Sequence, residues 1–264
     1  MRVIYGIGHL KLQKASCVTI GVFDGMHRGH NSIIRKTVAL AKKKNLVSVV
    51  VTFYPHPDAI IHTKKYSPLL ISLKHRLAII RSFGADVCVI VRFDARFRER
   101  SARDFVSDIL IRRCRMKDLV VNRMFTFGRY KEGGEQFLKA IAKEMPFTLH
   151  FQKVMKHHGK VISSTLIRSL IMQGQLKRAV SLLGREVEVI GTVVGGDSRG
   201  RKLGFPTANI DPHHEVIPSK GVYLIQAKVG KRTLFGVANI GFRPTFTSAQ
   251  KEIIELHLLN FNRN

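Results

Sequence analysis

The fold of this chain is decided by the segment Gly21-Val22-Phe23-Asp24-Gly25-Met26-His27-Arg28-Gly29-His30. It follows the apolar run from Cys17 to Ile20 and precedes a stretch with helical periodicity, so we expect a strand-to-helix turn. Backbone N–H groups and the positive end of the helix dipole point at such a turn. The sequence therefore predicts a phosphate-binding turn at the start of a helix.

The pattern around this turn predicts a parallel α/β domain, because short β-branched runs alternate with longer amphipathic stretches. The expected strands are Val18 to Phe23, Leu46 to Phe53, Val87 to Phe93, Leu119 to Val121 and Phe147 to Gln152. The expected helices are Gly29 to Lys44, Leu73 to Phe83, Ala102 to Cys114 and Glu135 to Glu144. Ligands of such folds bind at the carboxyl ends of the strands. The turn and the segment Thr52-Phe53-Tyr54-Pro55-His56-Pro57 are therefore expected at one edge of the sheet.

The character of the chain changes at Gly184, after a helical patch from Ser163 to Leu183. Short β-rich runs separated by Gly, Pro and Asn or Asp turns then predict a small antiparallel barrel or sandwich. These runs are Val187 to Val194, Gly221 to Val229, Leu234 to Asn239 and Ile253 to Leu259. A chain of 264 residues has room for two cores. We expect two domains, residues 1–183 and 184–264.

The net charge of +27 fits an enzyme for anionic substrates as well as a nucleic-acid binder. The excess lies in residues 1–183, which hold 34 Lys and Arg against 11 Asp and Glu. No aromatic pattern interleaves the basic clusters, as single-strand binders require. A solvated basic face is therefore favoured over a specific RNA site, and nucleic acid is not the expected partner.

The apolar segments and the cysteines bear on location. The chain has no 18-residue apolar run, and residues 1–17 lack the apolar core of a signal peptide, so we expect no membrane association and a cytoplasmic protein. The cysteines are Cys17, Cys88 and Cys114, which are widely separated and lack a Cys-x-x-Cys spacing. They are expected to be buried small hydrophobes rather than disulfides or zinc ligands.

His27 and His30 form the first candidate pair of site residues. Their spacing at a helix start directs both imidazoles to one side. A single histidine is usually an ordinary surface or core residue, but this pair is flanked by Gly21, Gly25 and Gly29. Small residues let a nucleotide approach the backbone, and imidazolium N–H groups stabilise charge on phosphate oxygens. The pair is expected to bind phosphate.

A second candidate group combines Asp24 with a distant helix start. Asp24 is expected to orient a hydroxyl, a metal or a neighbouring amide, or only to cap the turn. Ser163, Ser164 and Thr165 begin a helix and could serve only as caps. Arg168 lies on the same helix face as Ser164 and Thr165, where its guanidinium would suit the β- and γ-phosphates of ATP. The alternative is an arginine exposed to solvent. Together with the histidine pair, this spacing favours an ATP site.

A glycine-rich basic loop from Gly195 to Asn209 forms the third candidate site. Its glycines, among them Gly200 and Gly204, let backbone amides turn toward phosphates, although such loops are often only turns. Thr207 and Asn209 offer hard oxygen ligands for Mg²⁺. Further on, the alternation in Ile254-Glu255-Leu256-His257 places Glu255 and His257 on one strand face.

These motifs together resemble the nucleotidylyltransferase superfamily, and more narrowly the bacterial bifunctional riboflavin kinase / FAD synthetase (FMN adenylyltransferase) family. The motifs that carry the resemblance are Gly21 to His30, Thr52 to Pro57, Phe125-Thr126-Phe127-Gly128, Ser163 to Arg168, Pro206-Thr207-Ala208-Asn209, Asn239-Ile240-Gly241 and Pro244-Thr245-Phe246. The resemblance spans nearly the whole chain. It implies a Rossmann-like α/β nucleotidylyltransferase domain followed by a riboflavin kinase-like β-barrel.

The resemblance implies two reactions. The barrel would phosphorylate riboflavin to FMN, and the α/β domain would join FMN to AMP from ATP with release of pyrophosphate, both with Mg²⁺. It implies catalytic roles for His27, His30, Arg168 and, as general base of the kinase, Glu255. The implied ATP-binding residues are Gly21, Phe23, Asp24, Gly25, Gly29, Ser163, Ser164, Thr165, Gly200, Gly204 and Thr207. The implied flavin-binding residues are Pro55, His56, Pro57, Phe125 and Phe127, and the implied metal ligands are Thr207 and Asn209.

Three departures from the family pattern leave alternatives open. Asn122 and Met124 stand where the family carries Gly and Asp or Asn, and Asn260 stands where it carries Asp. The sequence also stops at Asn264, whereas family members continue through a further strand and a terminal helix. The alternatives are an FMN adenylyltransferase with a defective kinase half, and a basic nucleic-acid-binding protein on a degenerate scaffold. The oligomeric state is not predicted.

Overall fold

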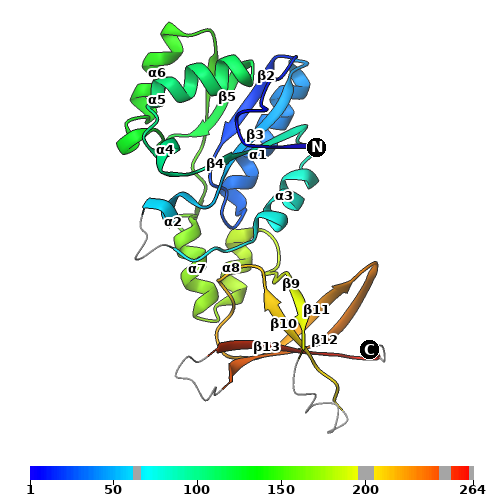
Figure 1. Cartoon of the computed structure of the whole chain (residues 1–264). Coiled ribbons are helices and arrows are strands. Elements are labelled where there is room, and N and C mark those ends of the chain that lie inside the picture. The colour runs from blue at the N-terminus through cyan, green and yellow to red at the C-terminus, as the bar shows by residue number, and fades with distance from the viewer. Residues whose placement is uncertain (62–66, 196–204, 244–250, 262–264) are drawn as a thin grey trace.

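A computed structural model of the chain describes residues 1–61, 67–195, 205–243 and 251–261 (Figure 1). It contains a parallel sheet with helices, followed by an antiparallel sheet, so the expected fold class is confirmed. Helices α7 and α8 lie between the two sheets (Figure 1). The predicted loop residues Gly200 and Gly204, like Pro244-Thr245-Phe246, lie outside the described residues.

The parallel sheet has six strands in the order β1-β4-β3-β2-β5-β6. They are β1 (Arg2–Tyr5), β2 (Ser16–Ile20), β3 (Val47–Tyr54), β4 (Val87–Arg92), β5 (Met116–Asn122) and β6 (Thr148–Gln152). Every residue of β2 is buried, as are the middle residues of β3 and β4. Strands rich in valine and isoleucine suit this position because both faces of a parallel sheet are covered. A separate hairpin joins β7 (Lys156–His157) to β8 (Lys160–Val161).

The helices of this part of the chain follow the predicted pattern. They are α1 (Arg28–Lys43), α2 (Pro57–Ile61), α3 (Leu73–Ser82), α4 (Ala95–Arg98), α5 (Ala102–Asp104), α6 (Glu135–Glu144), α7 (Ser164–Met172) and α8 (Leu176–Leu183). Helix α5 continues into the π-helix η1 (Phe105–Arg113), and a 3₁₀ turn η2 spans Arg129–Lys131. The short elements β1, α2 and α4 were not predicted. The first predicted strand ends at Ile20 rather than Phe23, because Phe23 has a left-handed φ of 53°.

The second sheet is antiparallel, with five strands in the order β11-β12-β13-β10-β9. They are β9 (Gly191–Val194), β10 (Ala208–Pro212), β11 (Gly221–Val229), β12 (Arg232–Arg243) and β13 (Lys251–Leu258). One face buries Ile240 and Ile254 against Ile217. The expected antiparallel, barrel-like architecture is confirmed, with β11 and β9 at the two ends of the described strand order.

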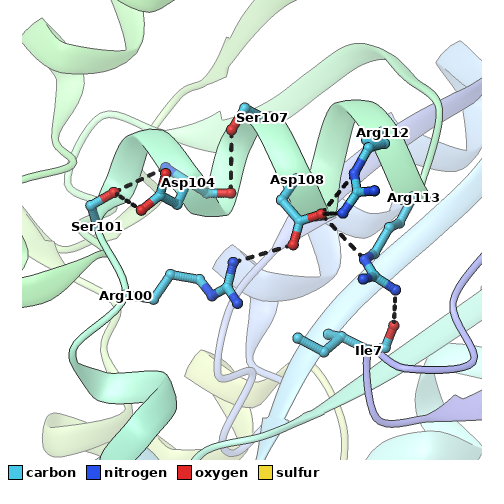
Figure 2. A network of polar contacts seen from close by, with 8 residues as sticks. All are labelled: Ile7, Arg100, Ser101, Asp104, Ser107, Asp108, Arg112 and Arg113. Carbon is cyan, nitrogen blue, oxygen red and sulfur yellow. Dashed lines mark hydrogen bonds and ion pairs between the residues drawn. The ribbon is translucent and has the colours of Figure 1, made fainter.

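A carboxylate clamp ties η1 to the N-terminal segment (Figure 2). The Asp108 carboxylate accepts hydrogen bonds from Arg100 Nη1 at 3.2 Å, from Arg113 Nε at 3.3 Å and from Arg112. Arg113 Nη1 also donates to the carbonyl of Ile7 at 2.9 Å. Burial raises the pKa of Asp108, but the hydrogen bonds and charges of Arg112 and Arg113 outweigh it and lower the pKa. The clamp therefore stabilises the charged carboxylate.

We expect Asp108→Asn to lower the free energy of unfolding at neutral pH by about 1 kcal/mol, as for a partly exposed ion-pair network. Because the folded-state pKa is depressed, this stabilisation is present above the ordinary aspartate pKa of about 4. It is lost as pH falls through the lower folded-state value. Urea unfolding at several pH values measures it, with Asp104→Asn on the same helix as the control. A difference that persists at pH 2 would contradict the clamp.

The cysteines are buried, as expected. Cys17, Cys88 and Cys114 are buried and free, and burial raises the pKa of each thiol to about 12. In the described ranges, no helix combines the length and the apolarity needed to cross a membrane.

Candidate active site

The turn between β2 and α1 has an unusual backbone. Phe23, Gly25 and Met26 have positive φ angles of 53°, 79° and 43°. Left-handed conformations of non-glycine residues cost about 1–3 kcal/mol each and cluster at functional sites. The left-handed φ of Gly25 favours glycine, and a Cβ there would also displace the Leu70 side chain, whose Cδ1 would lie at 2.6 Å. The contacts around the turn must hold it in this shape.

His27 and His30 stack on one another at the start of α1. Their ring centroids are 3.6 Å apart with an interplanar angle of 20°, so the two imidazoles lie on one side, as expected. His27 is the N-cap, and its Nδ1 accepts the backbone N–H of His30 at 3.4 Å. In the neutral ring of His27 the proton is therefore on Nε2. The rings of Phe23 and His30 are nearly perpendicular, with an interplanar angle of 87° and a centroid distance of 5.4 Å.

The protonation of the pair differs from the sequence expectation of imidazolium groups. Burial lowers the pKa of His27 to about 4. The pKa of His30 lies well below its ordinary value, first because of burial and then because of the charges of His27 and Arg76. Both rings are therefore neutral at neutral pH. A neutral imidazole still donates one N–H, and Nδ1 of His30 is buried without a hydrogen-bond partner.

The low pKa makes His27 a source of acid sensitivity. Unfolded histidine binds a proton near pH 6.5 and folded His27 only near pH 4, so acid favours the unfolded state between these values. His27→Asn keeps a capping acceptor and removes the titration. Relative to this variant, the wild type is expected to lose about 3 kcal/mol between pH 6.5 and 4, since one pKa unit corresponds to about 1.4 kcal/mol. Urea unfolding measures it, and a difference independent of pH would contradict the buried neutral ring.

Asp24 joins the turn to the start of α7. Its Oδ2 accepts from Arg168 Nη2 at 3.1 Å, and its Oδ1 accepts from the backbone N–H of Leu70 at 3.1 Å. Ser164 Oγ donates to the carbonyl of Asp24 at 2.7 Å, while Arg168 Nε donates to the carbonyl of Pro68 at 2.8 Å. Arg168 is 9% exposed, so the alternative of a solvated arginine is wrong. Two motifs far apart in sequence thus meet in one contact.

The hydroxyls at the start of α7 divide into different roles. Ser163 is the N-cap, and its Oγ accepts the backbone N–H of Leu166 at 3.3 Å. Ser163 therefore serves as a helix cap, which was one of the two roles considered from the sequence. Ser164 fixes the turn, as described above, and Thr165 is exposed toward the neighbouring cavity.

Arg76 was missed by the sequence analysis. It is 1% exposed, and its Nη1 donates to Thr52 Oγ1 at 3.3 Å and to the carbonyl of Phe53 at 3.2 Å. Its Nε is buried without a hydrogen-bond partner, and burial lowers the pKa of the guanidinium. Its charge acts on Asp24 and His30. The available signal was its position four residues before Ile80, on the apolar face of α3.

A cavity of about 330 Å³ opens at the carboxyl ends of β2, β3 and β5, a size in the range of small-molecule sites. The predicted site residues that line it are Gly21, Phe23, Asp24, His30, His56, Phe125, Ser164, Thr165 and Arg168. The predicted residues of this half that do not line it are Gly25, His27, Gly29, Ser163, Pro55, Pro57 and Phe127. His30 and Arg168 therefore face the same space, as an ATP site requires.

One wall of the cavity is aromatic. Phe125 lines it and stacks on Phe127 at a centroid distance of 5.3 Å and an interplanar angle of 15°. Phe127 packs into the core against Phe105, so it supports Phe125 instead of facing the cavity. Asn122 and Met124, the departures from the family pattern, also line the cavity, and Asn122 Oδ1 accepts the backbone N–H of Met124 at 2.8 Å.

In the second sheet, three predicted or motif residues form a row across neighbouring strands. Glu255 on β13 lies opposite Asn209 on β10 and opposite Asn239 on β12. Residues directly opposite in antiparallel strands share a face. His257 lies two residues along, and its Nδ1 is 2.9 Å from the carbonyl of Pro206. Glu255, the expected general base, and Asn209, one expected metal ligand, are thus cross-strand neighbours on one face of the sheet.

Thr207 and Asn260 flank the strands that carry this row. Thr207 is exposed and directly precedes β10. Asn260, another departure from the family pattern, follows β13 with a left-handed φ of 55°, which asparagine tolerates better than most residues.

Comparison with known proteins decides the family. Residues 9–166 match the family model described as FAD synthetase, and residues 183–264 match the one described as riboflavin kinase. The bifunctional riboflavin kinase/FMN adenylyltransferase of Escherichia coli (strain K12) is 38% identical over 263 residues, covering 98% of this chain and 84% of the relative. The chain belongs to the bifunctional riboflavin kinase/FMN adenylyltransferase family. The resemblance inferred from the motifs is confirmed.

Other relatives agree with this family. Proteins of the same name from Buchnera aphidicola subsp. Schizaphis graminum and Haemophilus influenzae are 33% and 32% identical, each covering 100% of this chain and 86% of the relative. A solved structure titled macrolide-efflux protein from Streptococcus pneumoniae has a TM-score of 0.88 and 26% identity. It covers 100% of this chain and 86% of that one. Its fold is that of this chain, although its title differs from the names of the bifunctional family.

Proposed function

We propose that this chain phosphorylates riboflavin to FMN and adenylylates FMN to FAD. We assign adenylyl transfer to residues 1–183 and phosphorylation to residues 184–264. The observation that carries the proposal is the cavity that His30, Asp24 and Arg168 line together, where Arg168 Nη2 donates to Asp24 Oδ2. The two family matches support the assignment of both activities to one chain.

In adenylyl transfer, an FMN phosphate oxygen attacks the α-phosphorus of ATP, and the bond to the β-phosphate breaks to release pyrophosphate. The neutral N–H group of His30, which lines the cavity, would donate to the oxygens of the five-coordinate phosphorus, and His27, stacked on it, would hold its ring in place. Arg168, which lines the cavity, would supply positive charge to the phosphates, and the buried Arg76 would add its charge through its effect on Asp24. Phe125 would stack on the flavin or the adenine. Alignment and charge stabilisation are sufficient, and no covalent enzyme intermediate is required.

In riboflavin phosphorylation, Glu255 would accept the proton of the 5′-hydroxyl as it attacks the γ-phosphorus of ATP. Asn209, which faces Glu255, and the adjacent Thr207 would hold Mg²⁺. Amide, carboxylate and hydroxyl oxygens are the hard donors that Mg²⁺ prefers, so the residues present fit the ion. The ion would neutralise charge on the phosphates.

The full chain tests the proposal in two assays. In the first assay, purified protein receives FMN, ATP and Mg²⁺. In the second assay, it receives riboflavin, ATP and Mg²⁺. The flavins formed in each assay are separated by chromatography. FAD in the first and FMN in the second support both activities, and chelation of Mg²⁺ is the control. FAD alone selects the adenylyltransferase with a defective kinase half. Neither product, together with salt-dependent RNA binding, selects the nucleic-acid alternative. A cytoplasmic location and the absence of a nucleic-acid partner stay predictions.

A further inference from the structure

Arg185 reaches from the segment after α8 to the back of the phosphate-binding turn. Its Nη2 donates to the carbonyl of Gly25 at 2.9 Å, and its Nη1 donates to the carbonyl of Glu186 at 3.0 Å. Its side chain is 19% exposed, and its Nε is buried without a hydrogen-bond partner. A guanidinium held in this way is a fixed part of the structure behind the turn.

Glu188 supports Arg185 and joins it to α3. Its Oε2 lies 3.6 Å from Arg185 Nη1 and 2.8 Å from Nε2 of the buried His75. Hydrogen bonding by His75 lowers the pKa of Glu188, against the opposing effect of burial, so the carboxylate stays charged. His75 directly precedes Arg76, whose charge acts on Asp24. The contacts of Arg185 thus reach the turn at Gly25 directly and helix α3 through Glu188 and His75.

Gly25 needs this contact because of its place in the turn. It lies between Asp24, which lines the cavity, and Met26, whose φ of 43° is left-handed. The side of the turn at Asp24 is held by Ser164 and Arg168. At Gly25 the guanidinium of Arg185 provides the side-chain donor to the carbonyl.

We propose that Arg185 is a positioning residue for adenylyl transfer, which acts through the Gly25 carbonyl on the stacked pair His27 and His30. The inference rests on the adenylyl transfer proposed above. Without the guanidinium the turn relaxes, and the imidazole N–H groups move from the positions where charge develops. Misplacement by about 1 Å far from the reacting atoms lowers rates by up to about 10²-fold.

The test compares Arg185→Ala with Arg178→Ala, an exposed arginine of α8 that contacts Gln175. Arg185→Ala is expected to lower kcat for FAD formation from FMN by at least about tenfold. KM for FMN and for ATP is expected to stay within about threefold, because the contact acts on alignment rather than on ground-state binding. Riboflavin phosphorylation and the Arg178→Ala variant are expected to match the wild type.

Arg185→Lys separates positioning from folding. It keeps the charge and the long stem but replaces the fork of N–H groups by one ammonium, so its kcat is expected between those of the wild type and the alanine variant. If Arg185→Ala does not fold, a lowered kcat of Arg185→Lys with unchanged phosphorylation supports the inference. Arg185 variants with wild-type kcat, or equal losses in both reactions, overturn it. A wild type that forms no FAD instead refutes the proposed function.

Discussion

His30→Ala is expected to lower FAD formation from FMN by about 10²- to 10³-fold, the effect of removing one preorganised donor from a reacting oxyanion. His30 lines the cavity, stacks on His27, and carries a buried Nδ1 without a hydrogen-bond partner. A cavity-lining ring with an unpartnered nitrogen supports its assignment to ligand binding. Riboflavin phosphorylation is expected to continue at the wild-type rate, because Glu255 and Asn209 lie in the other sheet.

The matched control is His9→Ala, which removes an exposed imidazole from the same half of the chain. Both reactions are followed by chromatography of the flavins under saturating ATP and Mg²⁺. His30→Asn retains a side-chain N–H donor, so it is expected to recover part of the lost rate. Equal loss of both activities in His30→Ala would contradict the separation of the two sites.

Because the histidine pair is neutral, we expect no change in the rate of adenylyl transfer between pH 6 and 8 that arises from these two rings. Because the pKa of His27 is about 4 and that of His30 lies well below its ordinary value, neither ring changes charge between pH 6 and 8 in the free protein. The sequence could place the two rings together but not show this. Spacing along a helix is a local property, whereas the pKa depends on burial by distant segments.

The sheet and its helices were predictable because periodicity is local. The strands Val47–Tyr54 and Val87–Arg92 and the helix Glu135–Glu144 lie within one or two residues of the expected ranges. Short elements such as Arg2–Tyr5 and Ala95–Arg98 were missed, since four residues carry too little pattern.

The site was predictable where a motif is compact, and less so where tertiary contacts define a role. Asp24 was expected to orient a hydroxyl, a metal or an amide, and it binds the amide of Leu70 and the guanidinium of Arg168. Arg76 and Arg185 were not identified, because each is an isolated arginine in the sequence. Their contacts come from Phe53 and Gly25, which lie far away along the chain.

Glu255→Gln is expected to lower riboflavin phosphorylation by about 10²- to 10⁴-fold, the usual contribution of a general base. Glutamine keeps the size of the side chain and its place opposite Asn209 and Asn239 but cannot accept the proton of the hydroxyl. FAD formation from FMN is expected to stay unchanged. Glu186→Gln, an exposed carboxylate in the same part of the chain, is the matched control.

Mixing the Glu255→Gln and His30→Ala variants in one solution tests the roles of both residues together. With riboflavin and ATP, Glu255→Gln is expected to make little FMN, and His30→Ala is expected to make FMN but little FAD. Combined in one solution, they should make FAD, because FMN released by one variant diffuses to the intact adenylyl-transfer site of the other. A wild-type phosphorylation rate in Glu255→Gln would contradict its role as the base. A mixture that makes FMN but no FAD would contradict two independent sites.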